Sequence, residues 1–259
     1  MKFPDPIAKT GCKKFILQST SIIKEINGII GKILPKNANS LSTNSYRDLL
    51  LEIQNEINEN KFHHIIAFEN KSFFDTLFLN DEYFITSVAH IRGVRPSSNE
   101  PLEYLGLHRE NFYADGDYIN HQINVQIPIR NYNVQTSMFY LPKSHLISDS
   151  ELKLKKMDSS FSKVDRFSSG HKIGLSYNPK LIELGLDKSK VKRLNIKPNQ
   201  GFAFSSKLIH GGGSNLTKTI RFSMDFGLIP YLKASESKNK HFASYSKNKS
   251  PYESISRLN

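Results

Sequence analysis

The chain has 259 residues, of which 38% are hydrophobic and 23% are charged, a balance that suits a soluble globular protein. No run of 18 apolar residues occurs, so the sequence predicts no transmembrane helix, and the N-terminus lacks the apolar stretch of a signal peptide. Cys12 is the only cysteine, which excludes an internal disulfide and indicates a reducing, cytoplasmic location.

The formal net charge is +12, and nucleic acid, an anionic membrane surface or an acidic substrate could each account for such an excess. The basic residues are spread along the chain, and the segment from Tyr231 onward, with six Lys/Arg against two Glu, holds only +4 of the total. Because no basic stripe stands out, we expect a solvated basic surface rather than a nucleic-acid or membrane partner.

The first part of the chain has helical periodicity. Isoleucines at helical spacing predict an amphipathic helix over residues 13–34, a second helix is expected over 44–58, and a short third helix over 72–79. His63 and His64 fall at an element boundary between them. Because the side chains of adjacent residues diverge, the sequence gives no reason to expect a metal there.

After residue 82 the hydrophobic pattern changes to period two, which is typical of strands. The candidate strands are residues 83–92, 104–113, 121–130, 136–141, 171–177, 191–197, 201–208 and 219–229. This many strands, separated by turn signals, predict a mainly β protein with flanking helices, in which the strands form a sandwich or barrel.

No linker-like segment divides the chain, so we expect one domain over residues 1–231, with a helical part at 13–80 and a β core at 83–231. The serine-rich segment 150–170 predicts a long loop, which could serve as a lid or be a plain surface insertion. Residues 232–259 have the composition of a polar, basic and flexible tail.

Three residues form a candidate metal-binding set: His108, Glu110 and His210. On a strand, the side chains of His108 and Glu110 point to the same face, because successive side chains alternate. Two imidazoles and one carboxylate hold one face of an octahedral Fe(II) and leave the opposite face open. Three glycines follow His210, and they fit either a sharp turn beside a metal or an ordinary hairpin with a surface histidine.

Polar residues alternate with apolar ones on two of the predicted strands. Arg221 and Ser223 share the polar face of 219–229, and Asn124 and Gln126 share the polar face of 121–130. A buried arginine needs an anion, and a guanidinium beside a hydroxyl is a suitable receptor for a carboxylate. Polar inner faces are natural in a barrel whose interior binds a ligand.

Three segments resemble the motifs of Fe(II)- and 2-oxoglutarate-dependent dioxygenases, and among them the phytanoyl-CoA dioxygenase-like group: LGLHRENFY, FYLPKSHLISD and NQGFAFSSKLIHGGGSNLTKTIRFSMDFGLIPY. The similarity spans residues 83 to 231. It implies a double-stranded β-helix core of the jelly-roll or cupin type, with the N-terminal helices packed outside. It also implies a hydroxylase that uses Fe(II), 2-oxoglutarate and O₂ on a small molecule and releases succinate and CO₂.

Carried over by position, the resemblance implies three catalytic iron ligands, His108, Glu110 and His210. It implies that Arg221, assisted by Ser223, binds the distal carboxylate of 2-oxoglutarate. Asn124 and Gln126 match positions that often touch cosubstrate or substrate. The Pro142–His145 turn matches a turn that is usually structural, so His145 is expected to be a turn residue rather than a ligand.

The chain departs from the usual pattern in having Glu110 where aspartate is commoner, and Lys143 where the middle turn usually has glycine. The retained carboxylate disfavours a halogenase. Two alternatives stay open: a cupin-type metalloenzyme, which has no need for Arg221, and a non-catalytic basic binding module, which has no need for the metal ligands. The substrate is left open, an anionic small molecule being one option.

Overall fold

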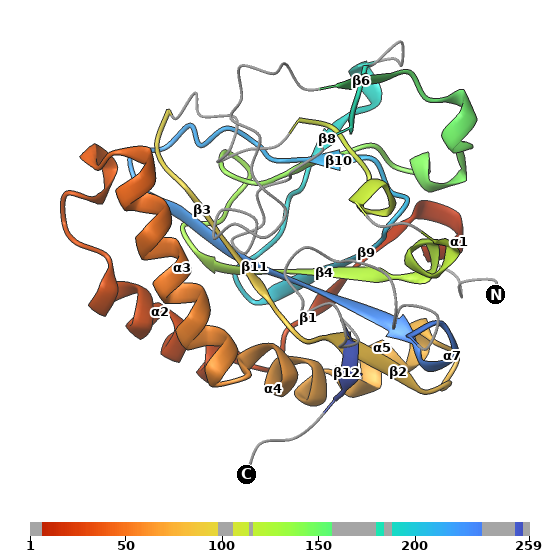
Figure 1. Cartoon of the computed structure of the whole chain (residues 1–259), viewed down its shortest axis with the longest axis horizontal. Helices are drawn as coiled ribbons and strands as arrows, with labels where there is room; N and C mark the ends of the chain where they lie inside the picture. Colours follow the sequence, from red (N-terminus) through yellow and green to blue (C-terminus); the bar gives the residue numbers. More distant parts are fainter. Residues whose placement is uncertain are drawn as a thin grey trace.

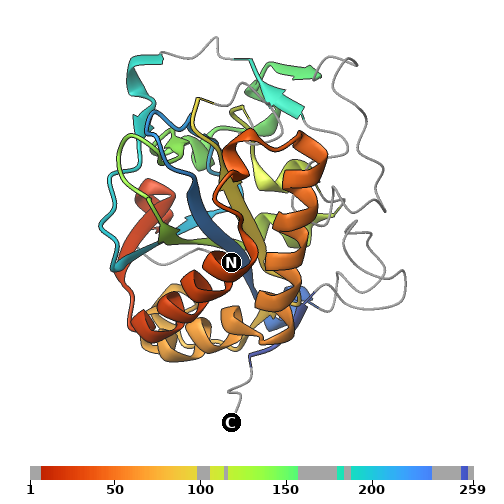
Figure 2. The same cartoon turned by 90° about the vertical axis from the view of Figure 1, so that its left-hand side faces the viewer.

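The computed structural model describes residues 7–97, 106–113, 116–156, 180–183, 188–234 and 252–255. In this part of the chain a large antiparallel sheet lies at the centre, helices cover one side of it, and a smaller sheet lies beyond its other side (Figures 1 and 2). No helix among the described residues is both long and apolar enough to cross a lipid bilayer.

Four helices form an outer layer: α2 (Thr20–Ile33), α3 (Thr43–Glu59), α4 (Phe62–Glu69) and α5 (Lys71–Leu77), whereas the short α1 (Ile7–Thr10) leads into the first strand. The helices of the layer carry apolar stripes at spacings of three and four residues, and α2 buries Ile22, Ile26 and Ile30. Burying each such side chain contributes about 1.5–3 kcal/mol relative to leaving it in water. The stripes therefore fix which faces of the helices lie on the sheet.

The large sheet has the strand order β1 (Cys12–Ile16), β9 (Gln200–Ser205), β4 (Ile123–Arg130), β11 (Arg221–Pro230), β2 (Tyr83–Thr86) and β12 (Tyr252–Ser254), with β3 (His90–Val94) also paired to β11. The smaller sheet has the order β10 (His210–Gly211), β5 (Phe139–Tyr140) and β8 (Lys192–Arg193). A separate pair joins β6 (Leu154–Lys156) to β7 (Lys180–Ile182).

Short helices occupy the connections: η1 (Ala38–Ser40), η2 (Glu110–Tyr113), η3 (Asp117–His121), η4 (Ser144–Leu146), η5 (Asp149–Glu151), η6 (Lys188–Lys190) and, after β11, α7 (Tyr231–Ala234). All are 3₁₀ helices except α7, and each has three to five residues. They connect strands without adding a further layer to the fold.

The two faces of the large sheet differ in chemistry. On β4 and β11 the apolar residues, such as Val125 and Met224, pack with the helices in one hydrophobic cluster. The alternating polar residues therefore point to the opposite, inner face. There Asp225 of β11 pairs in register with Gln126 of β4. The polar alternation of both strands was predicted, and the register places the two polar rows side by side.

The helix predicted over residues 13–34 is wrong in its first part. Residues Cys12–Ile16 form β1, which pairs antiparallel with β9, and the helix begins only at Thr20. The side chain of Ile16 is exposed, so this residue does not belong to the isoleucine stripe of α2. Lys13 to Ile16 alternates in burial, with Phe15 packed inside, which is the periodicity of an edge strand.

The strand predicted over residues 104–113 is wrong where the structure describes it. His108 takes part only in an isolated bridge to His210, and Glu110–Tyr113 forms the 3₁₀ helix η2. The buried guanidinium of Arg109 explains the irregularity, because it bonds the carbonyls of Ser144 and Ile147 instead of facing solvent. A regular strand would have placed that side chain on an open face.

Other predicted strands differ in extent. The strand at 83–92 is divided into β2 and β3, and the strand at 191–197 is reduced to the two residues of β8. The strand predicted at 171–177 lies outside the described residues, as does the loop 150–170 after residue 156. The described start of that loop contains η5 and β6.

The C-terminal segment differs from the expected tail at residues 252–255. There β12 pairs antiparallel with β2, with Glu253 opposite Ile85 (Figure 1). Tyr252 is buried on this strand, and its hydroxyl donates to Oε1 of Gln122. One buried aromatic and two flanking polar residues give no strand signal in the sequence, because the pairing partner lies about 170 residues away.

Candidate metal centre

His108 and His210 lie side by side through their main chains. The amide of His108 donates to the carbonyl of His210 at 2.8 Å, and the amide of His210 donates to the carbonyl of His108 at 3.0 Å. This antiparallel bridge brings the ring centroids to 4.4 Å, and both residues are only 6% exposed. The prediction that the two histidines meet is therefore confirmed in the structure.

The hydrogen bonds of the two imidazoles fix their tautomers. Nδ1 of His108 donates to the carbonyl of Gly106 at 2.7 Å, and Nδ1 of His210 donates to the carbonyl of Leu208 at 2.9 Å. A carbonyl oxygen can only accept, so Nδ1 bears the proton in each ring and Nε2 keeps its lone pair. Such a bond from the far nitrogen is what orients a metal-binding histidine.

Glu110 completes the set from the first residue of η2. Its Oε1 lies 3.2 Å from Nε2 of His210 and 3.5 Å from Nε2 of His108. The three ligand atoms all lie within 4.8 Å of one another. The side chain of Glu110 is 28% exposed, so the cluster reaches the protein surface on the carboxylate side.

The charge states of these groups suit a bound cation. Burial, together with the neighbouring His210, lowers the pKa of His108, so its ring stays neutral. Burial alone would raise the pKa of Glu110, but the influence of His108 and His210 outweighs burial and holds this pKa well below its usual value, so the side chain is a carboxylate. One carboxylate and two imidazole nitrogens that converge on one point can together bind a divalent cation. The donor set therefore fits a metal.

Arg221 and Ser223 form a second polar site on the inner face of β11. The Nη1 of Arg221 donates to Oγ of Ser223 at 2.9 Å, and the guanidinium lies 5.5 Å from the ring centroid of Tyr132. Arg221 is 3% exposed, and among the described residues its Nε has no hydrogen-bond partner. Burial lowers the pKa of this guanidinium, since no described carboxylate forms a salt bridge with it. A buried cation in this state is suited to an incoming anion.

Asn124 and Gln126 are buried on the inner face of β4, as predicted, but each already has protein partners. The amide nitrogen of Gln126 donates to Asp225 at 3.2 Å, and its oxygen accepts from the hydroxyl of Tyr132. The amide oxygen of Asn124 accepts from Gln122, while its Nδ2 has no partner among the described residues. Of the two, Asn124 therefore keeps a donor that a ligand could use.

Tyr132 and Phe204, which the sequence did not single out, connect the two sites. The rings of Phe204 and His210 pack edge to face, with their centroids 4.7 Å apart. Phe204 also belongs to the same hydrophobic cluster as Tyr132. Tyr132 in turn lies under the guanidinium of Arg221. Tyr132 lies outside the quoted motifs, and Phe204 lies within one of them at a position to which no role was assigned, so only the folded arrangement identifies the two residues.

The Pro142–His145 turn supports the centre from outside. Nε2 of His145 bonds the carbonyl of Ala8 at 3.1 Å, and Oγ of Ser144 accepts from the amide of Ile209 at 2.7 Å. The bond to Ile209 anchors the chain immediately before His210, and the bond to Ala8 holds the turn against α1. The structure thus agrees with the expected role of His145 as a turn residue.

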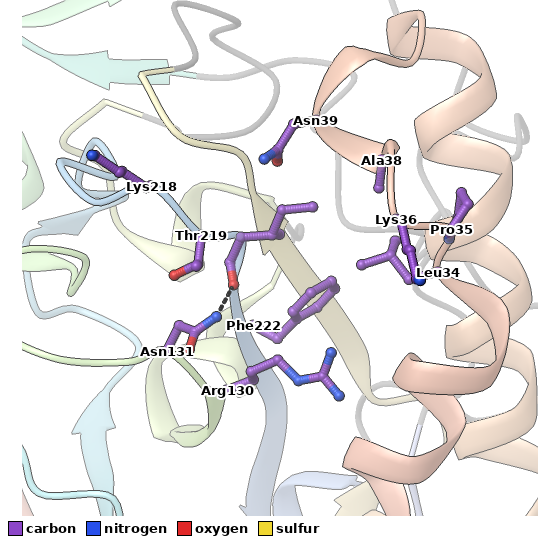
Figure 3. A pocket seen from close by; sticks show the side chains of 11 residues that line it. Leu34, Pro35, Lys36, Ala38, Asn39, Arg130, Asn131, Lys218, Thr219 and Phe222 are labelled. Atoms are coloured by element: carbon purple, nitrogen blue, oxygen red, sulfur yellow. Dashed lines mark hydrogen bonds between the residues drawn. The ribbon is translucent and has the colours of Figure 1, made fainter.

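A surface pocket lies away from these residues, between the end of α2 and the start of β11 (Figure 3). Its volume is ≈ 170 Å³, and Lys36, Arg130 and Lys218 make its lining basic. Arg130 is held by Asn27, to which it donates from both Nε and Nη2. None of the three candidate metal ligands lines this pocket, so it is separate from the metal centre.

No protein-family model matches the sequence, and no curated protein matches it either. The fold, in contrast, is shared with solved structures. The non-heme monooxygenase ThoJ superimposes with a TM-score of 0.56 at 14% identity, covering 86% of this chain and 75% of ThoJ. EvdO2 from Micromonospora carbonacea var. aurantiaca superimposes with a TM-score of 0.53 at 13% identity, covering 86% of this chain and 88% of EvdO2.

The epimerase SnoN, solved in complex with Fe³⁺, alpha ketoglutarate and nogalamycin RO, gives a TM-score of 0.51 at 8% identity, covering 91% of this chain and 82% of SnoN. Identities this low show the fold alone, and the phytanoyl-CoA dioxygenase-like resemblance still depends on the sequence motifs. The predicted architecture is confirmed: the chain has the jelly-roll fold of the non-heme iron, 2-oxoglutarate-dependent oxygenases, with its N-terminal helices packed outside.

Proposed function

We propose that this protein is an Fe(II)- and 2-oxoglutarate-dependent oxygenase that hydroxylates a small molecule. The observation that carries the proposal is the convergence of three acceptor atoms, Nε2 of His108, Oε1 of Glu110 and Nε2 of His210. The shared fold supports it, since ThoJ and SnoN are respectively a non-heme monooxygenase and an epimerase solved with Fe³⁺ and alpha ketoglutarate. Fold alone does not fix function, so the residues must carry the argument.

In this proposal His108, Glu110 and His210 bind ferrous iron through one face and leave the opposite face open. Bound iron with 2-oxoglutarate supplies the O₂-dependent oxidation of a substrate C–H bond, with release of succinate and CO₂. The protein holds the ligands in place. The Nδ1 bonds to Gly106 and Leu208 orient both rings, and the His108–His210 bridge sets their separation.

Arg221 and Ser223 bind the distal carboxylate of 2-oxoglutarate in this proposal. The guanidinium is buried, its Nε has no hydrogen-bond partner among the described residues, and its Nη1 already aligns the Ser223 hydroxyl. A carboxylate would neutralise it and accept charge-assisted hydrogen bonds from both side chains. Asn124 would contribute its Nδ2, which has no partner in the described part of the chain, to cosubstrate or substrate, and Gln126 would shape the wall beside Tyr132.

Two alternatives account for less of the structure. A metalloenzyme of the same fold that uses no 2-oxoglutarate leaves the buried charge of Arg221 unexplained. A non-catalytic basic binding module leaves the convergence of two imidazoles and a carboxylate at one point unexplained.

The proposed substrate is a small molecule. SnoN binds nogalamycin RO, a small molecule, and we propose a small-molecule substrate here as well. An anionic substrate would agree with the net charge of +12, and the single cysteine supports a cytoplasmic location.

Anaerobic addition of Fe(II) and then 2-oxoglutarate to the chelator-treated protein tests this function. The proposal predicts a visible charge-transfer band that requires both components. His210→Ala should abolish the band, and Arg221→Gln should raise the 2-oxoglutarate concentration needed for half-maximal absorbance at least ~10-fold, since it removes a charge-assisted pair.

Two variants serve as matched controls for this experiment. His121→Gln changes a histidine that pairs with Asp117 on η3, and Arg130→Gln changes an arginine of β4 that is held by Asn27. Both should leave the band and its 2-oxoglutarate dependence unchanged. A band that survives His210→Ala, or one that needs no 2-oxoglutarate, would overturn the proposal.

A further inference from the structure

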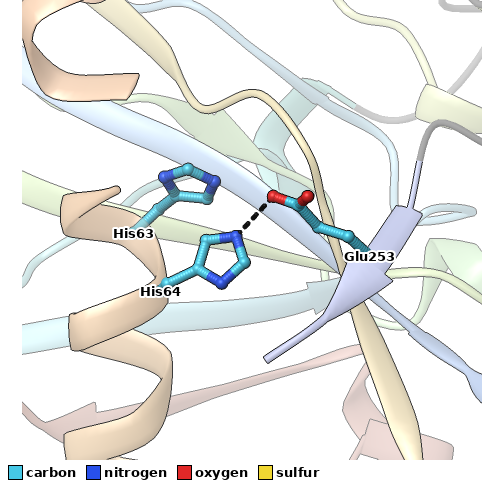
Figure 4. A group of neighbouring side chains, drawn as sticks. All are labelled: His63, His64 and Glu253. Atoms are coloured by element: carbon cyan, nitrogen blue, oxygen red, sulfur yellow. Dashed lines mark hydrogen bonds and ion pairs between the residues drawn. The ribbon is translucent and has the colours of Figure 1, made fainter. Parts of the chain in front are cut away.

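A second group of donor atoms lies between α4 and the C-terminal strand β12 (Figure 4). His63 and His64 are consecutive residues of α4, and Glu253 reaches them from β12. Nε2 of His64 lies 2.7 Å from Oε1 of Glu253, and the two imidazole centroids are 4.6 Å apart. One ligand atom from each of the three residues lies within 4.8 Å of the others.

The divergence expected of adjacent histidines does not prevent this convergence. The planes of the two rings are inclined by 75°, so the edge of one ring points at the face of the other. Figure 4 shows the carboxylate of Glu253 approaching the space between the rings. The third donor comes from the far end of the sequence, which is why spacing along the chain gave no sign of the group.

His63 is the member that the protein alone leaves unsatisfied. It is completely buried, and neither of its ring nitrogens makes a hydrogen bond of regular geometry with the described residues, although the backbone of Thr86 lies near the ring. Leaving a buried polar group unpaired costs about 1–3 kcal/mol, and such groups in native proteins usually have a partner such as water or an ion. Glu253 is 37% exposed, so the cluster has an open side through which an ion could enter.

We propose that His63, His64 and Glu253 bind a divalent transition metal of the Zn²⁺ type. Two imidazoles and one carboxylate are a donor set that zinc accepts, at bond lengths of about 2.0–2.2 Å and in tetrahedral geometry. Donors in such a site are separated by roughly 3.3–3.5 Å. The His64–Glu253 distance of 2.7 Å is shorter than this separation, and the three ligand atoms all lie within 4.8 Å of one another. Small rotations of the side chains would move the three atoms to the spacing that a bound metal requires.

The metal would fasten the C-terminal segment to the domain. β12 pairs only with β2 at the edge of the large sheet, and in the described residues it is only three residues long. Glu253 would hold one face of this strand to α4 through the metal. Tyr252 holds the other face, where its hydroxyl bonds Gln122 beside the inner row of β4. The proposed metal site is therefore structural, because it would link α4 to β12.

The test uses the full chain with His108→Ala and His210→Ala, which removes two donors of the first centre. After chelator treatment, this variant is titrated with Zn²⁺ by calorimetry and with Co²⁺ by absorbance, and bound metal is counted by mass spectrometry. The proposal predicts one equivalent per chain. Adding His64→Gln or Glu253→Gln should weaken binding at least ~10-fold, the minimum expected even for supporting residues of a metal site.

The exposed pair of His121 and Asp117 provides the matched control, because it is also a histidine–carboxylate contact. His121→Gln and Asp117→Asn should leave metal binding unchanged. Hydrogen exchange of the residue 252–255 amides should slow on adding Zn²⁺ to the starting variant and not to the Glu253→Gln variant. Should the starting variant fail to fold, the unsubstituted protein should bind two equivalents of metal and its Glu253→Gln variant one.

Absence of bound metal, or binding that both His64→Gln and Glu253→Gln leave intact, would overturn the proposal. The first result would mean that His64 and Glu253 form a hydrogen bond without a metal ion. Neither result bears on the proposed oxygenase function, because the starting variant lacks the first centre.

Discussion

His108 and His210 are joined by an isolated antiparallel bridge, so the main chain and not the side chains sets the separation of their rings. Glu110 then places an anion 3.2 Å from Nε2 of His210. The three candidate ligands are therefore already in place before a cation arrives. This arrangement resembles the preorganisation that functional sites require.

Replacing Glu110 by Gln should weaken metal binding and also lower the stability of the metal-free protein. Because the pKa of Glu110 is held well below its usual value, the folded state favours the carboxylate, and a neutral amide loses that contribution at pH 7. Urea unfolding with chelator at pH 7 measures the loss. Fe(II) titration should show at least ~10-fold weaker binding. A variant that is more stable than the unsubstituted protein would contradict this account of the charges.

The surroundings of Gly93 on β3 and of Gly28 on α2 predict opposite effects on stability when each glycine is replaced by alanine. A Cβ on Gly93 would lie 2.4 Å from the hydroxyl of Tyr46 and 2.7 Å from Leu50, so Gly93→Ala should cost about 1–3 kcal/mol by overpacking. A Cβ on Gly28 of α2 would meet nothing within 4 Å, so Gly28→Ala should add about 0.5–1 kcal/mol. Thermal unfolding of both variants measures the difference. Equal effects of the two substitutions would contradict the packing.

Arg109 should be a major contributor to stability although its neighbours are the candidate ligands. Its guanidinium is buried and bonds Asp149 and the carbonyls of Ser144 and Ile147. Arg109→Met leaves the carbonyls of Ser144 and Ile147 without this donor, so it should cost about 1–3 kcal/mol. Lys71→Met is the control: Lys71 pairs with Asp75 on the surface of α5, and this change should cost under ~1 kcal/mol. Urea unfolding compares them, and a small loss for Arg109→Met would show that the 108–113 segment is held by other contacts.

Cys12 should react slowly with alkylating reagents. Burial raises the pKa of its thiol from 9.0 to about 11, despite the hydrogen bond to Thr10. Only the thiolate reacts, so labelling of the folded protein at pH 8 should be roughly 100-fold slower than in urea. Since the folded pKa is raised, the stability linked to this thiol is complete below pH 9 and is lost between pH 9 and 11. Equal labelling rates in the folded and urea-unfolded protein would contradict the burial of Cys12.

The sequence was sufficient for those parts of the fold and site that depend on local periodicity. The stripes of α3 and the alternation of β4 and β11 identified the helix, the strands and their polar faces. The alternation also placed Arg221 and Ser223 on one buried face, where the structure finds their hydrogen bond. His108, Glu110 and His210 were found by residue type and motif.

Contacts between distant segments could not be predicted in this way. β1 and β12 owe their conformation to pairing with β9 and β2, and neither has a strong pattern of its own. His108 and Glu110 meet their partner from an irregular segment and not from a strand, because the side chain of Arg109 is drawn inward. The grouping of His64 with Glu253 spans 189 residues and follows only from the folded sheet.

Anomalous diffraction at the iron edge, from crystals grown anaerobically with Fe(II) and 2-oxoglutarate, tests the central claim most directly. The account predicts one iron peak at about 2.0–2.2 Å from His108 Nε2, Glu110 Oε1 and His210 Nε2 together. It also predicts the distal carboxylate of 2-oxoglutarate on Arg221 and Ser223. An iron peak that contacts fewer than all three ligands, or no peak among them, would contradict it.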